Sequence, residues 1–409
     1  MSKLSSKAKI LAVTDAYLPG FRAGGPIRSV SNLVTALDGN EFEFCVLTRD
    51  RDHTDTVPYR DVATDTWVRV GTVQVLYTAD LSLANLRRRI IEAKPDIIYL
   101  NGFFSCFTIK ILLLRRLGML PSVAVVVAPR GEFSPGALAL KRTKKIIFMA
   151  VAARVGLYRN ILWQASAQKE KDELQKVFST FPFGTKGRRD AASRIHVASN
   201  ISSDVPVATL CREAKEKHPG QVSFVFVSRV SPMKNLAAAI EMVSSLEGEI
   251  AFDIFGSVDD PKYWEECWKL TERTPENVKI RYLGALPHNE VWQKFSQYHF
   301  FLFPTLGENF GHVIVESLGA GCPVIVSDRT PWNGLQPRNV GWDLTLDDRP
   351  LWHNVLQHCT DMDAETYVKM SNAAVDFMRD WLRSPKIFED NVNLFKKALS
   401  MWKSGAKDV

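Results

Sequence analysis

Short apolar runs alternate along the chain with longer stretches whose apolar residues recur at helical spacing. This alternation is typical of β-α-β units, in which helices connect parallel strands. In the first half it predicts strands at Ile10–Thr14, Phe44–Thr48, Val73–Tyr77, Ile97–Leu100, Val123–Ala128 and Ile161–Gln164. After a further strand at Ile195–Ala198, a second series predicts strands at Phe224–Ser228, Ala251–Phe255, Val278–Leu283, Phe300–Phe303 and Val324–Ser327. We therefore expect an α/β fold of two doubly wound, Rossmann-like domains that face a central cleft.

A polar stretch that contains a proline, Ser199–Pro206, separates the two series of strands. A chain of 409 residues is also longer than one hydrophobic core usually supports. We expect an N-terminal domain over residues 1–200 and a C-terminal domain over residues 201–380. The segment 364–402 reads as two helices separated at Ser384–Pro385. We expect the last helix, within residues 381–409, to return to the N-terminal domain.

The composition is that of an ordinary globular protein, with 46% hydrophobic and 24% charged residues. No apolar stretch approaches the ~18–20 residues that span a bilayer, and Met1–Ile10 has no apolar core of a signal peptide. Six cysteines, among them Cys211, lie far apart with no Cys-x-x-Cys pair. This spacing argues against structural zinc and indicates reduced thiols in a cytoplasmic protein.

The charge is distributed unevenly along the chain. Residues 1–200 carry 30 Lys and Arg against 17 Asp and Glu, a net +13, and the remainder is 22 against 28, a net −6. Between Asp96 and Glu170 the only acidic residue is Glu132. The positive electrostatic potential of such a basic region favours a partner that carries phosphate, whether nucleic acid, anionic lipid or a phosphorylated substrate.

Two loops that follow predicted strands contain residues suited to binding phosphate. Gly24 and Gly25 precede a helix that begins near Pro26, where backbone can approach an anion at a helix N-terminus. A loop that only needs a positive φ angle is the alternative. Arg229 ends a predicted strand and Lys234 follows five residues later. Two cations on one such loop can clamp a diphosphate, unless they are solvated surface side chains.

The segment FLFPTLGENFGHVIVESLGAGCPVIVSD contains two glutamates after a buried strand. Glu308 lies in the loop, and a helix is expected to open near Asn309–Gly311 and to run to about Ala320. The backbone N–H groups of Asn309, Phe310 and Gly311 would point from this helix start into the cleft. Glu316 lies about 12 Å from Glu308 if the residues between them are helical. This separation suits two carboxylates that bind different hydroxyl groups of one ligand, and it is too wide for a glycosidase pair.

The combination of these motifs resembles the family 4 retaining glycosyltransferases, which have the GT-B fold. The resemblance rests on Glu308 and Glu316, on Arg229 with Lys234, on the Gly24–Gly25 loop, and on the tail SDRTPWNGL…NVGW. This tail is similar to that of bacterial members that build surface polysaccharides such as capsule and O-antigen, the latter a part of lipopolysaccharide.

The resemblance implies a role for each of these residues. Glu316 would hold the ribose hydroxyls of a UDP- or GDP-linked sugar, and Glu308 would contact the hydroxyls of the sugar. Arg229 and Lys234 would neutralise the diphosphate leaving group, so that no metal ion and no further cofactor are needed. Amide groups near Gly24–Gly25 and in the segment Asn309, Phe310 and Gly311 would assist them.

One position departs from the family pattern. Where the family often has a histidine, after the strand VAVVVA, this chain has Arg130. Arg130 would either stabilise the departing phosphate or bind an anionic acceptor. Asn101 and the pair Phe103–Phe104, which follow the strand IIYL, are expected on the acceptor side, with ordinary loop residues as the alternative.

The segment 135–160 is expected to form a helix with a cationic stripe and an apolar flank. The cations are Lys141, Arg142, Lys144 and Lys145. Such a helix can lie on an anionic membrane, or it packs as an ordinary solvated helix on its own sheet. Because acceptors of this family are commonly lipid-linked, we expect peripheral binding at the inner face of the cytoplasmic membrane.

The sequence thus predicts a retaining hexosyltransferase that acts on a glycan or lipid-linked glycan in surface polysaccharide synthesis. The alternatives are a GT-B epimerase or phosphorylase, a binding subunit without catalysis, and a basic nucleic-acid-binding protein. The last is disfavoured because the chain contains no recognisable nucleic-acid-binding motif.

Overall fold

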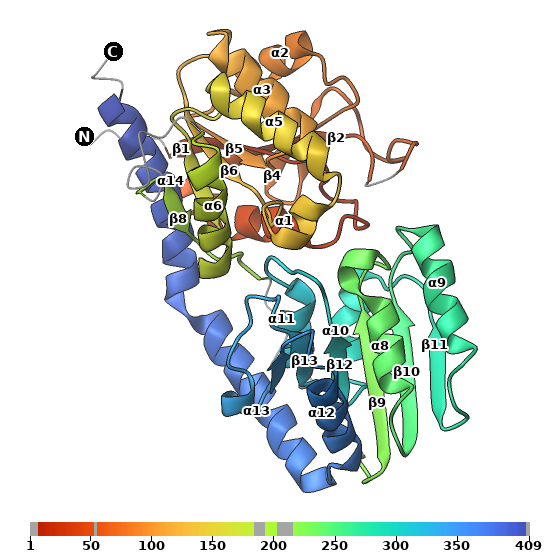
Figure 1. The fold of residues 1–409 in the computed structure, drawn as a ribbon. Coiled ribbons are helices and arrows are strands. Elements are labelled where there is room, and N and C mark those ends of the chain that lie inside the picture. The colour runs from red at the N-terminus through yellow and green to blue at the C-terminus, as the bar shows by residue number, and fades with distance from the viewer. Residues whose placement is uncertain (1–6, 53–54, 184–192, 203–215, 406–409) are drawn as a thin grey trace. The chain divides into compact units, whose positions relative to one another are not determined.

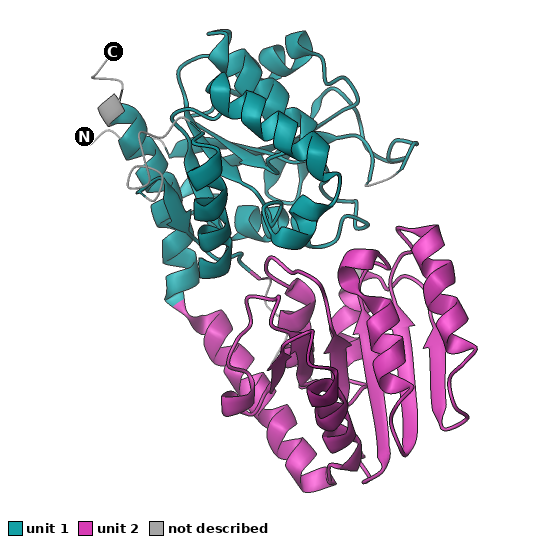
Figure 2. Cartoon of the chain, viewed as in Figure 1, with its two compact units in different colours: residues 1–201, 385–409 teal, residues 202–384 magenta. Residues whose placement is uncertain are grey.

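The computed structural model describes residues 7–52, 55–183, 193–202 and 216–405. The chain forms two units, which Figure 2 shows in different colours. Unit 1 comprises residues 1–201 and 385–409, and unit 2 comprises residues 202–384. Residues 203–206 of the expected linker and Cys211 lie outside the described residues.

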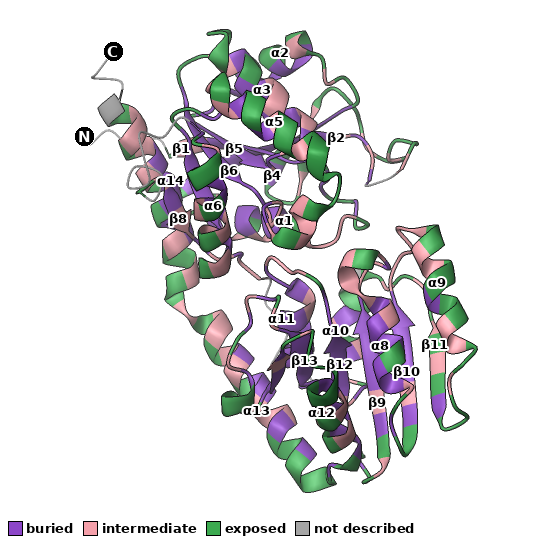
Figure 3. Cartoon of the chain, viewed as in Figure 1, coloured by how far each residue is buried: buried purple, intermediate pink, exposed green. Residues whose placement is uncertain are grey.

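Unit 1 contains an eight-stranded sheet with the strand order β3-β4-β2-β1-β5-β6-β7-β8 (Figure 1). Its strands are β1 (Ala8–Val13), β2 (Phe42–Arg49), β3 (Trp67–Val70), β4 (Val73–Thr78), β5 (Ile97–Asn101), β6 (Ala124–Ala128), β7 (Leu162–Ala165) and β8 (Ile195–Val197). Neighbouring strands are parallel except for β3, which pairs antiparallel with β4. Figure 3 shows the central strands of this sheet as buried.

Helices cover both faces of this sheet. They are α1 (Gly25–Leu37), α2 (Leu83–Ala93), α3 (Cys106–Arg116), α4 (Pro135–Ala139), α5 (Arg142–Arg154), α6 (Gln168–Thr180) and α14 (Pro385–Gly405). One core cluster contains buried residues of α2, α3, α5 and α6, and a second contains those of α1 and α14. The sheet is therefore doubly wound.

The C-terminal helix α14 belongs to the core of unit 1. The ring of Phe395 makes edge contacts with Phe42 and Phe44 of β2 and with Tyr99 of β5. Asn391 donates a hydrogen bond to the carbonyl oxygen of Ser199 at 2.8 Å. The helix begins at the expected break, because α13 ends at Arg383 and α14 starts at Pro385.

Unit 2 contains a six-stranded parallel sheet with the order β11-β10-β9-β12-β13-β14. The strands are β9 (Gln221–Val227), β10 (Glu249–Phe255), β11 (Val278–Tyr282), β12 (Phe300–Phe303), β13 (Val324–Ser327) and β14 (Gly341–Leu344). The helices are α8 (Leu236–Val243), α9 (Pro261–Thr271), α10 (Val291–Phe295), α11 (His312–Gly319), α12 (Arg349–Asp361) and α13 (Ala364–Arg383). Short 3-10 turns η1 (Pro232–Lys234), η2 (His288–Glu290) and η3 (Gln336–Arg338) complete the unit.

All twelve strands predicted from the apolar pattern are present, with ends that differ by a few residues. The pattern missed β3 and β14. Each has four residues and lies at an edge of its sheet. A charged residue, Arg69 in β3 and Asp343 in β14, interrupts the apolar positions, so neither strand produces a continuous apolar run.

The basic segment that was expected as one helix forms two. α4 ends at Ala139, and Lys141 adopts a left-handed conformation with φ of 53° before α5 begins at Arg142. L-residues adopt this conformation singly and do not continue a helix through it. The cationic and apolar positions therefore lie on α5 rather than on a continuous helix from Pro135 to Asn160.

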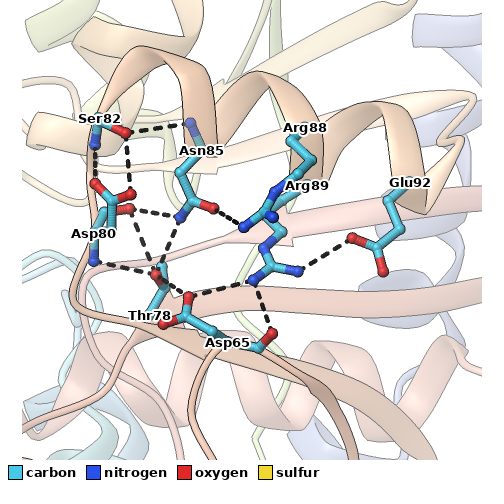
Figure 4. A network of polar contacts seen from close by, with 8 residues as sticks. All are labelled: Asp65, Thr78, Asp80, Ser82, Asn85, Arg88, Arg89 and Glu92. Atoms are coloured by element: carbon cyan, nitrogen blue, oxygen red, sulfur yellow. Dashed lines mark hydrogen bonds and ion pairs between the residues drawn. The ribbon is translucent and has the colours of Figure 1, made fainter.

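A polar network fastens the loop before β3 to the end of β4 and to α2 (Figure 4). Its members are Asp65, Thr78, Asp80, Ser82, Asn85, Arg88, Arg89 and Glu92. Thr78 donates to the Asp65 carboxylate at 2.7 Å, and the buried Arg89 guanidinium donates to the Asp65 carbonyl oxygen, also at 2.7 Å. Glu92 gives the guanidinium a carboxylate partner at 3.3 Å. The loop is therefore held by a buried cation.

We predict that Arg89→Met lowers the free energy of unfolding by about 2 kcal/mol, because charge-assisted hydrogen bonds of a buried group are lost. Urea denaturation followed by circular dichroism measures this change. Arg87→Met on the same helix is the matched control, since Arg87 is exposed and is not a member of the network, and it should stay within about 0.5 kcal/mol of the wild type. Equal losses in the two variants would contradict the role of the network.

Candidate functional site

In unit 2 the loops that follow β9 and β12 are joined to each other. The two strands are parallel neighbours, so their carboxyl ends lie at the same edge of the sheet. The backbone N–H of Leu306 donates to the carbonyl oxygen of Met233 at 2.9 Å. Asn235 donates through its side chain to the carbonyl oxygen of Pro304, also at 2.9 Å. The loop with the two predicted cations and the loop with Glu308 therefore form one structural element.

Lys234 and Glu308 form an ion pair at the junction of these loops. The distance between Lys234 Nζ and Glu308 Oε2 is 2.7 Å, and the side chains are only 14% and 17% exposed. Burial alone would raise the pKa of Glu308, but the charge and hydrogen bond of Lys234 and the adjacent amides outweigh it and hold the pKa below its usual value. Glu308 is therefore a carboxylate at neutral pH.

Arg229, the second predicted cation, also has a carboxylate partner. Its Nη1 lies 2.5 Å from Asp259 Oδ2. Asp259 follows β10 and is fixed by its own backbone, because its N–H donates to the carbonyl oxygen of Val230 at 3.2 Å. The sequence analysis did not identify Asp259, although an acidic residue that closely follows a predicted strand was a usable signal.

The amide groups expected to face a ligand are turned toward Glu308. The backbone N–H of Asn309 donates to Glu308 Oε1 at 3.0 Å, and that of Phe310 also stabilises this carboxylate. Helix α11 begins at His312, slightly later than expected, with Gly311 as its N-cap. Gly311 has a φ of 81°, and a Cβ atom there would lie 2.8 Å from Ile314 Cδ1, so only glycine fits. The estimate of 12 Å between the glutamates assumed a helix over residues 308–311, and that assumption is wrong.

The other residues of this motif point into unit 2. The Phe310 ring is buried against Trp332 and Trp381, and its carbonyl oxygen accepts a hydrogen bond from Trp332 Nε1 at 2.5 Å. Glu316 lies buried in the second turn of α11, and His312 packs against the Phe310 ring. Phe310 can therefore serve a ligand only through its backbone.

In unit 1 the glycine pair lies where β1 leads into α1. Gly24 is the N-cap of α1 with a φ of 65°, and Gly25 is the first residue of the helix. A Cβ atom at Gly24 would meet nothing within 4 Å, so the glycine is required by its backbone conformation. The preceding loop is held by Asp52, whose Oδ2 accepts the amides of Phe21 and Arg22 at 2.7 and 2.9 Å.

Arg130 and Asn101 lie together at the carboxyl ends of β6 and β5. Arg130 Nε and Nη2 donate to Asn101 Oδ1 at 3.0 and 2.7 Å, and Nη2 also donates to the Tyr99 hydroxyl at 2.7 Å. Asn101 in turn donates to the carbonyl oxygen of Val13 on β1. The structure thus brings two predicted acceptor-side residues into one network, and it adds Tyr99, which the sequence analysis missed.

Phe103, the third predicted acceptor-side residue, is fully buried in the core of unit 1. Its ring stacks on Tyr158 with a centroid distance of 4.3 Å, so the expectation that its side chain lines a site is wrong. Its backbone N–H and that of Phe104, at 3.1 Å, donate to the Glu132 carboxylate. Burial raises the pKa of Glu132 to about 7, against the opposing effects of these amides and of Lys145.

Solved structures share this fold, and a glycosyltransferase is among them. WaaG, a glycosyltransferase involved in lipopolysaccharide biosynthesis, matches with a TM-score of 0.67 and 14% identity over 94% of this chain and 99% of that one. HepE of Anabaena in complex with UDP-glucose matches with a TM-score of 0.64 and 17% identity over 96% and 99%. These similarities show that the fold is GT-B, as expected from the sequence.

The sequence comparisons find similarity to glycosyltransferases in part of the chain. Residues 209–334 match the model of the group 1 glycosyl transferases. The O-antigen chain mannosyltransferase B of Escherichia coli is 27% identical over 108 residues, which are 26% of this chain and 28% of the relative. The poly(glycerol-phosphate) alpha-glucosyltransferase of Bacillus subtilis is 35% identical over 112 residues, 25% of this chain and 15% of the relative. The alignments therefore span less than a third of these curated relatives.

The match over residues 209–334 agrees with the resemblance drawn from the motifs, since this part of the chain is similar to the group 1 glycosyl transferases, which are retaining, metal-independent GT-B enzymes. Among the described residues, no three His, Cys, Asp or Glu side chains form a group that could hold a metal ion. In the same part of the chain, no helix has the length and apolarity needed to cross a bilayer.

We predict that the stability of the protein depends on pH through Glu132. Because its pKa is raised from 4.5 to about 7, the folded state binds more protons than the unfolded state between these values, and stability falls as the pH rises through them. Glu132→Gln should remove this dependence. The difference in the free energy of unfolding between the variant and wild type should therefore shift in favour of the variant by about 2 kcal/mol from about pH 5 to about pH 8.

Urea denaturation at both pH values measures this difference. Glu43→Gln, which removes an exposed carboxylate, is the control and should follow the wild-type pH dependence. Parallel pH profiles for wild type and Glu132→Gln would contradict the prediction.

Proposed function

We propose that this protein transfers a hexosyl group from a nucleoside diphosphate sugar to a hydroxyl group of a glycan or lipid-linked glycan, with retention of anomeric configuration. The observation that carries this proposal is the pair Lys234–Glu308, buried on two interlocked loops with Arg229 nearby in sequence. These loops lie at the carboxyl ends of β9 and β12, between which the strand order of unit 2 reverses. Ligands of doubly wound folds bind at such reversal points.

In this proposal unit 2 binds a UDP- or GDP-linked donor. Lys234 and Arg229 stabilise the negative charge that grows on the diphosphate as it leaves, which is the task that a metal ion performs elsewhere. Each cation already has a carboxylate partner, so the diphosphate competes with Glu308 and Asp259 for them. Displacement of Glu308 from Lys234 would free its carboxylate for the hydroxyls of the sugar. Glu316 would bind the ribose.

Unit 1 would bind the acceptor, with Arg130 and Asn101 at its carboxyl edge and with backbone amides near Gly24–Gly25 assisting the phosphates. Synthesis of a bacterial surface polysaccharide is the proposed context. The similarity to an O-antigen mannosyltransferase and to a lipopolysaccharide glycosyltransferase supports it. A GT-B epimerase or phosphorylase would act without a lipid-linked acceptor, so turnover with added glycolipid separates these activities.

We further propose that α5 attaches the protein to the inner face of the cytoplasmic membrane. Lys141, Arg142 and Lys144 are exposed at the start of this helix. Ile147 and Val151, one turn apart, are 59% and 56% exposed. Surface cations each gain about 1 kcal/mol at an anionic bilayer, and exposed aliphatic side chains add burial in the interface.

Lys145 does not share this exposure with the other three cations. Its Nζ donates to the carbonyl oxygen of Ala137 at 2.6 Å and lies 5.1 Å from the centre of the Phe104 ring. Partial burial lowers the pKa of Lys145. The expectation that all four cations face one surface is therefore wrong, and we leave Lys145 out of the proposed membrane surface.

We predict that one nucleoside diphosphate sugar raises the melting temperature by several degrees at about 100 times its Kd, because a ligand of the folded state stabilises it. A panel of UDP- and GDP-linked sugars identifies this donor. No stabilisation and no turnover with any of them would contradict the proposed function.

The two glutamates should then respond differently to substitution. Glu316→Gln should weaken binding of the nucleoside diphosphate about tenfold or more, because a hydrogen-bond acceptor for the ribose is lost. Glu308→Gln should retain this affinity within about threefold, since it removes a competing anion from Lys234, while turnover falls about 100-fold. Calorimetry and turnover assays measure both effects. Glu365→Gln, an exposed change on α13, is the control, and equal affinities in the two variants would contradict the assignment.

We predict that the protein sediments with acidic liposomes and much less with neutral ones, and that binding weakens with salt because screening shortens the reach of charges to ~8 Å. Changing Lys141, Arg142 and Lys144 to Gln should release it. The control changes Lys262, Lys269 and Lys279 of unit 2 to Gln, which are also exposed and alter the net charge equally. Release in both triple variants, or no sedimentation of wild type, would contradict the membrane surface.

A further inference from the structure

The Arg130 guanidinium is held in place entirely by neutral groups. Besides Asn101 and the Tyr99 hydroxyl, its Nη1 donates to the side-chain oxygen of Asn200. These partners are buried. Tyr99 is fixed in turn by a hydrogen bond from its hydroxyl to Gln164 at 2.5 Å. The guanidinium is therefore positioned by strands β5 and β7 and by the segment after β8.

Among the described residues, no carboxylate forms an ion pair with Arg130. The two acidic residues that next follow Arg130 in the sequence direct their oxygen atoms to backbone amides. Glu132 accepts the amides of Phe103 and Phe104. Glu170 accepts the amide of Gly131 at 2.7 Å and that of Ser166 at 2.6 Å. A half-buried cation without a carboxylate partner is stabilised when it binds a negatively charged ligand.

The hydrogen bonds of Arg130 leave one of its N–H groups available to a ligand. A guanidinium has five N–H groups, and the contacts to Asn101, Tyr99 and Asn200 use four of them. The remaining N–H is on Nη1. The backbone of Arg130 also has a φ of 57°, a conformation that costs energy for a residue with a side chain and is retained where surrounding structure imposes it. The cation is thus preorganised with one donor and its full charge available.

We propose that unit 1 recognises a negatively charged group, a carboxylate or a phosphate, on the sugar acceptor through Arg130. This inference rests on the proposed function, in which unit 1 binds the acceptor. The cations assigned to the donor diphosphate, Arg229 and Lys234, both carry exchangeable carboxylate partners. Arg130 instead has amide and hydroxyl partners that stay in place when an anion binds. The acceptor is therefore an acidic sugar or a sugar phosphate rather than a neutral sugar.

Three p-nitrophenyl glycosides test this proposal by calorimetry with the full-length protein. They are the β-glucuronide, its methyl ester, and the β-glucoside 6-phosphate. The acid and its ester differ mainly in charge, so comparing them tests whether a negative charge is recognised. Comparing the acid with the phosphate shows whether the preferred anion is a carboxylate or a phosphate. Wild type should bind the acid or the phosphate about tenfold or more tightly than the ester. Arg130→Gln should abolish this preference, and Arg130→Lys should retain part of it.

Arg87→Gln is the matched control, since Arg87 is exposed on α2, and it should keep the wild-type preference. Equal affinity of wild type for all three glycosides, absence of binding by any of them, or a preference that survives in Arg130→Gln would overturn the proposal. If Arg130 instead contacts the departing diphosphate, Arg130→Gln weakens UDP or GDP binding while wild type does not discriminate acid from ester. A wild type that binds neither UDP nor GDP would contradict the proposed function itself.

Discussion

The candidate site of unit 2 depends on the parallel pairing of β9 with β10 on one side and β12 on the other. Parallel strands have their carboxyl ends at the same edge of a sheet. Where the strand order reverses, the connections of the two neighbouring strands run in opposite directions, so the loops that follow these strands diverge. The pairing therefore brings Arg229, Lys234, Asp259 and Glu308, which are up to 79 positions apart, to one edge. The hydrogen bonds between Met233 and Leu306 and between Asn235 and Pro304 then fix the loops to each other.

The protein uses two different ways to hold a partly buried cation. Lys234 and Arg229 are neutralised by carboxylates, which lowers the cost of taking the charges out of water. Arg130 is held by amide and hydroxyl oxygens, which satisfy its N–H groups but leave its charge uncompensated. The first arrangement suits a site in which an incoming anion exchanges with an internal one. The second suits a site in which the anion is supplied by the ligand alone.

Buried carboxylates in unit 1 have a further role, since they bind backbone amides in loops at the edge of the sheet. Asp52 holds the loop before Gly24, and Glu132 holds the loop after β5. Glu170 holds the turn after Arg130. Loops that lack regular hydrogen bonds must satisfy their N–H groups in some other way, and a carboxylate can accept two of them at once. These acidic residues therefore determine the shape of the edge on which Arg130 and Gly24 lie.

The sequence by itself determined the α/β class, twelve of the described strands and the strand ends at which the motif residues lie. The alternation of apolar runs and helical stretches is local, and buried parallel strands produce it strongly. The edge strands β3 and β14 were missed because a charged residue interrupts the apolar positions of each. The resemblance to the group 1 glycosyl transferases also followed from local motifs, since Glu308, Glu316, Arg229 and Lys234 lie at characteristic spacings.

Only the tertiary structure decided which groups pair. The Lys234–Glu308 contact joins residues 74 positions apart, and Arg130 reaches Asn200 across 70. Tertiary packing also decided three further features. They are the direction of the Asn309 amide toward Glu308, the burial of the Phe103 ring and the inward position of Lys145. Spacing along a chain predicts which side chains share an element or an edge. The direction of a side chain and its partner depend on packing between elements that are distant in sequence, which no local pattern records.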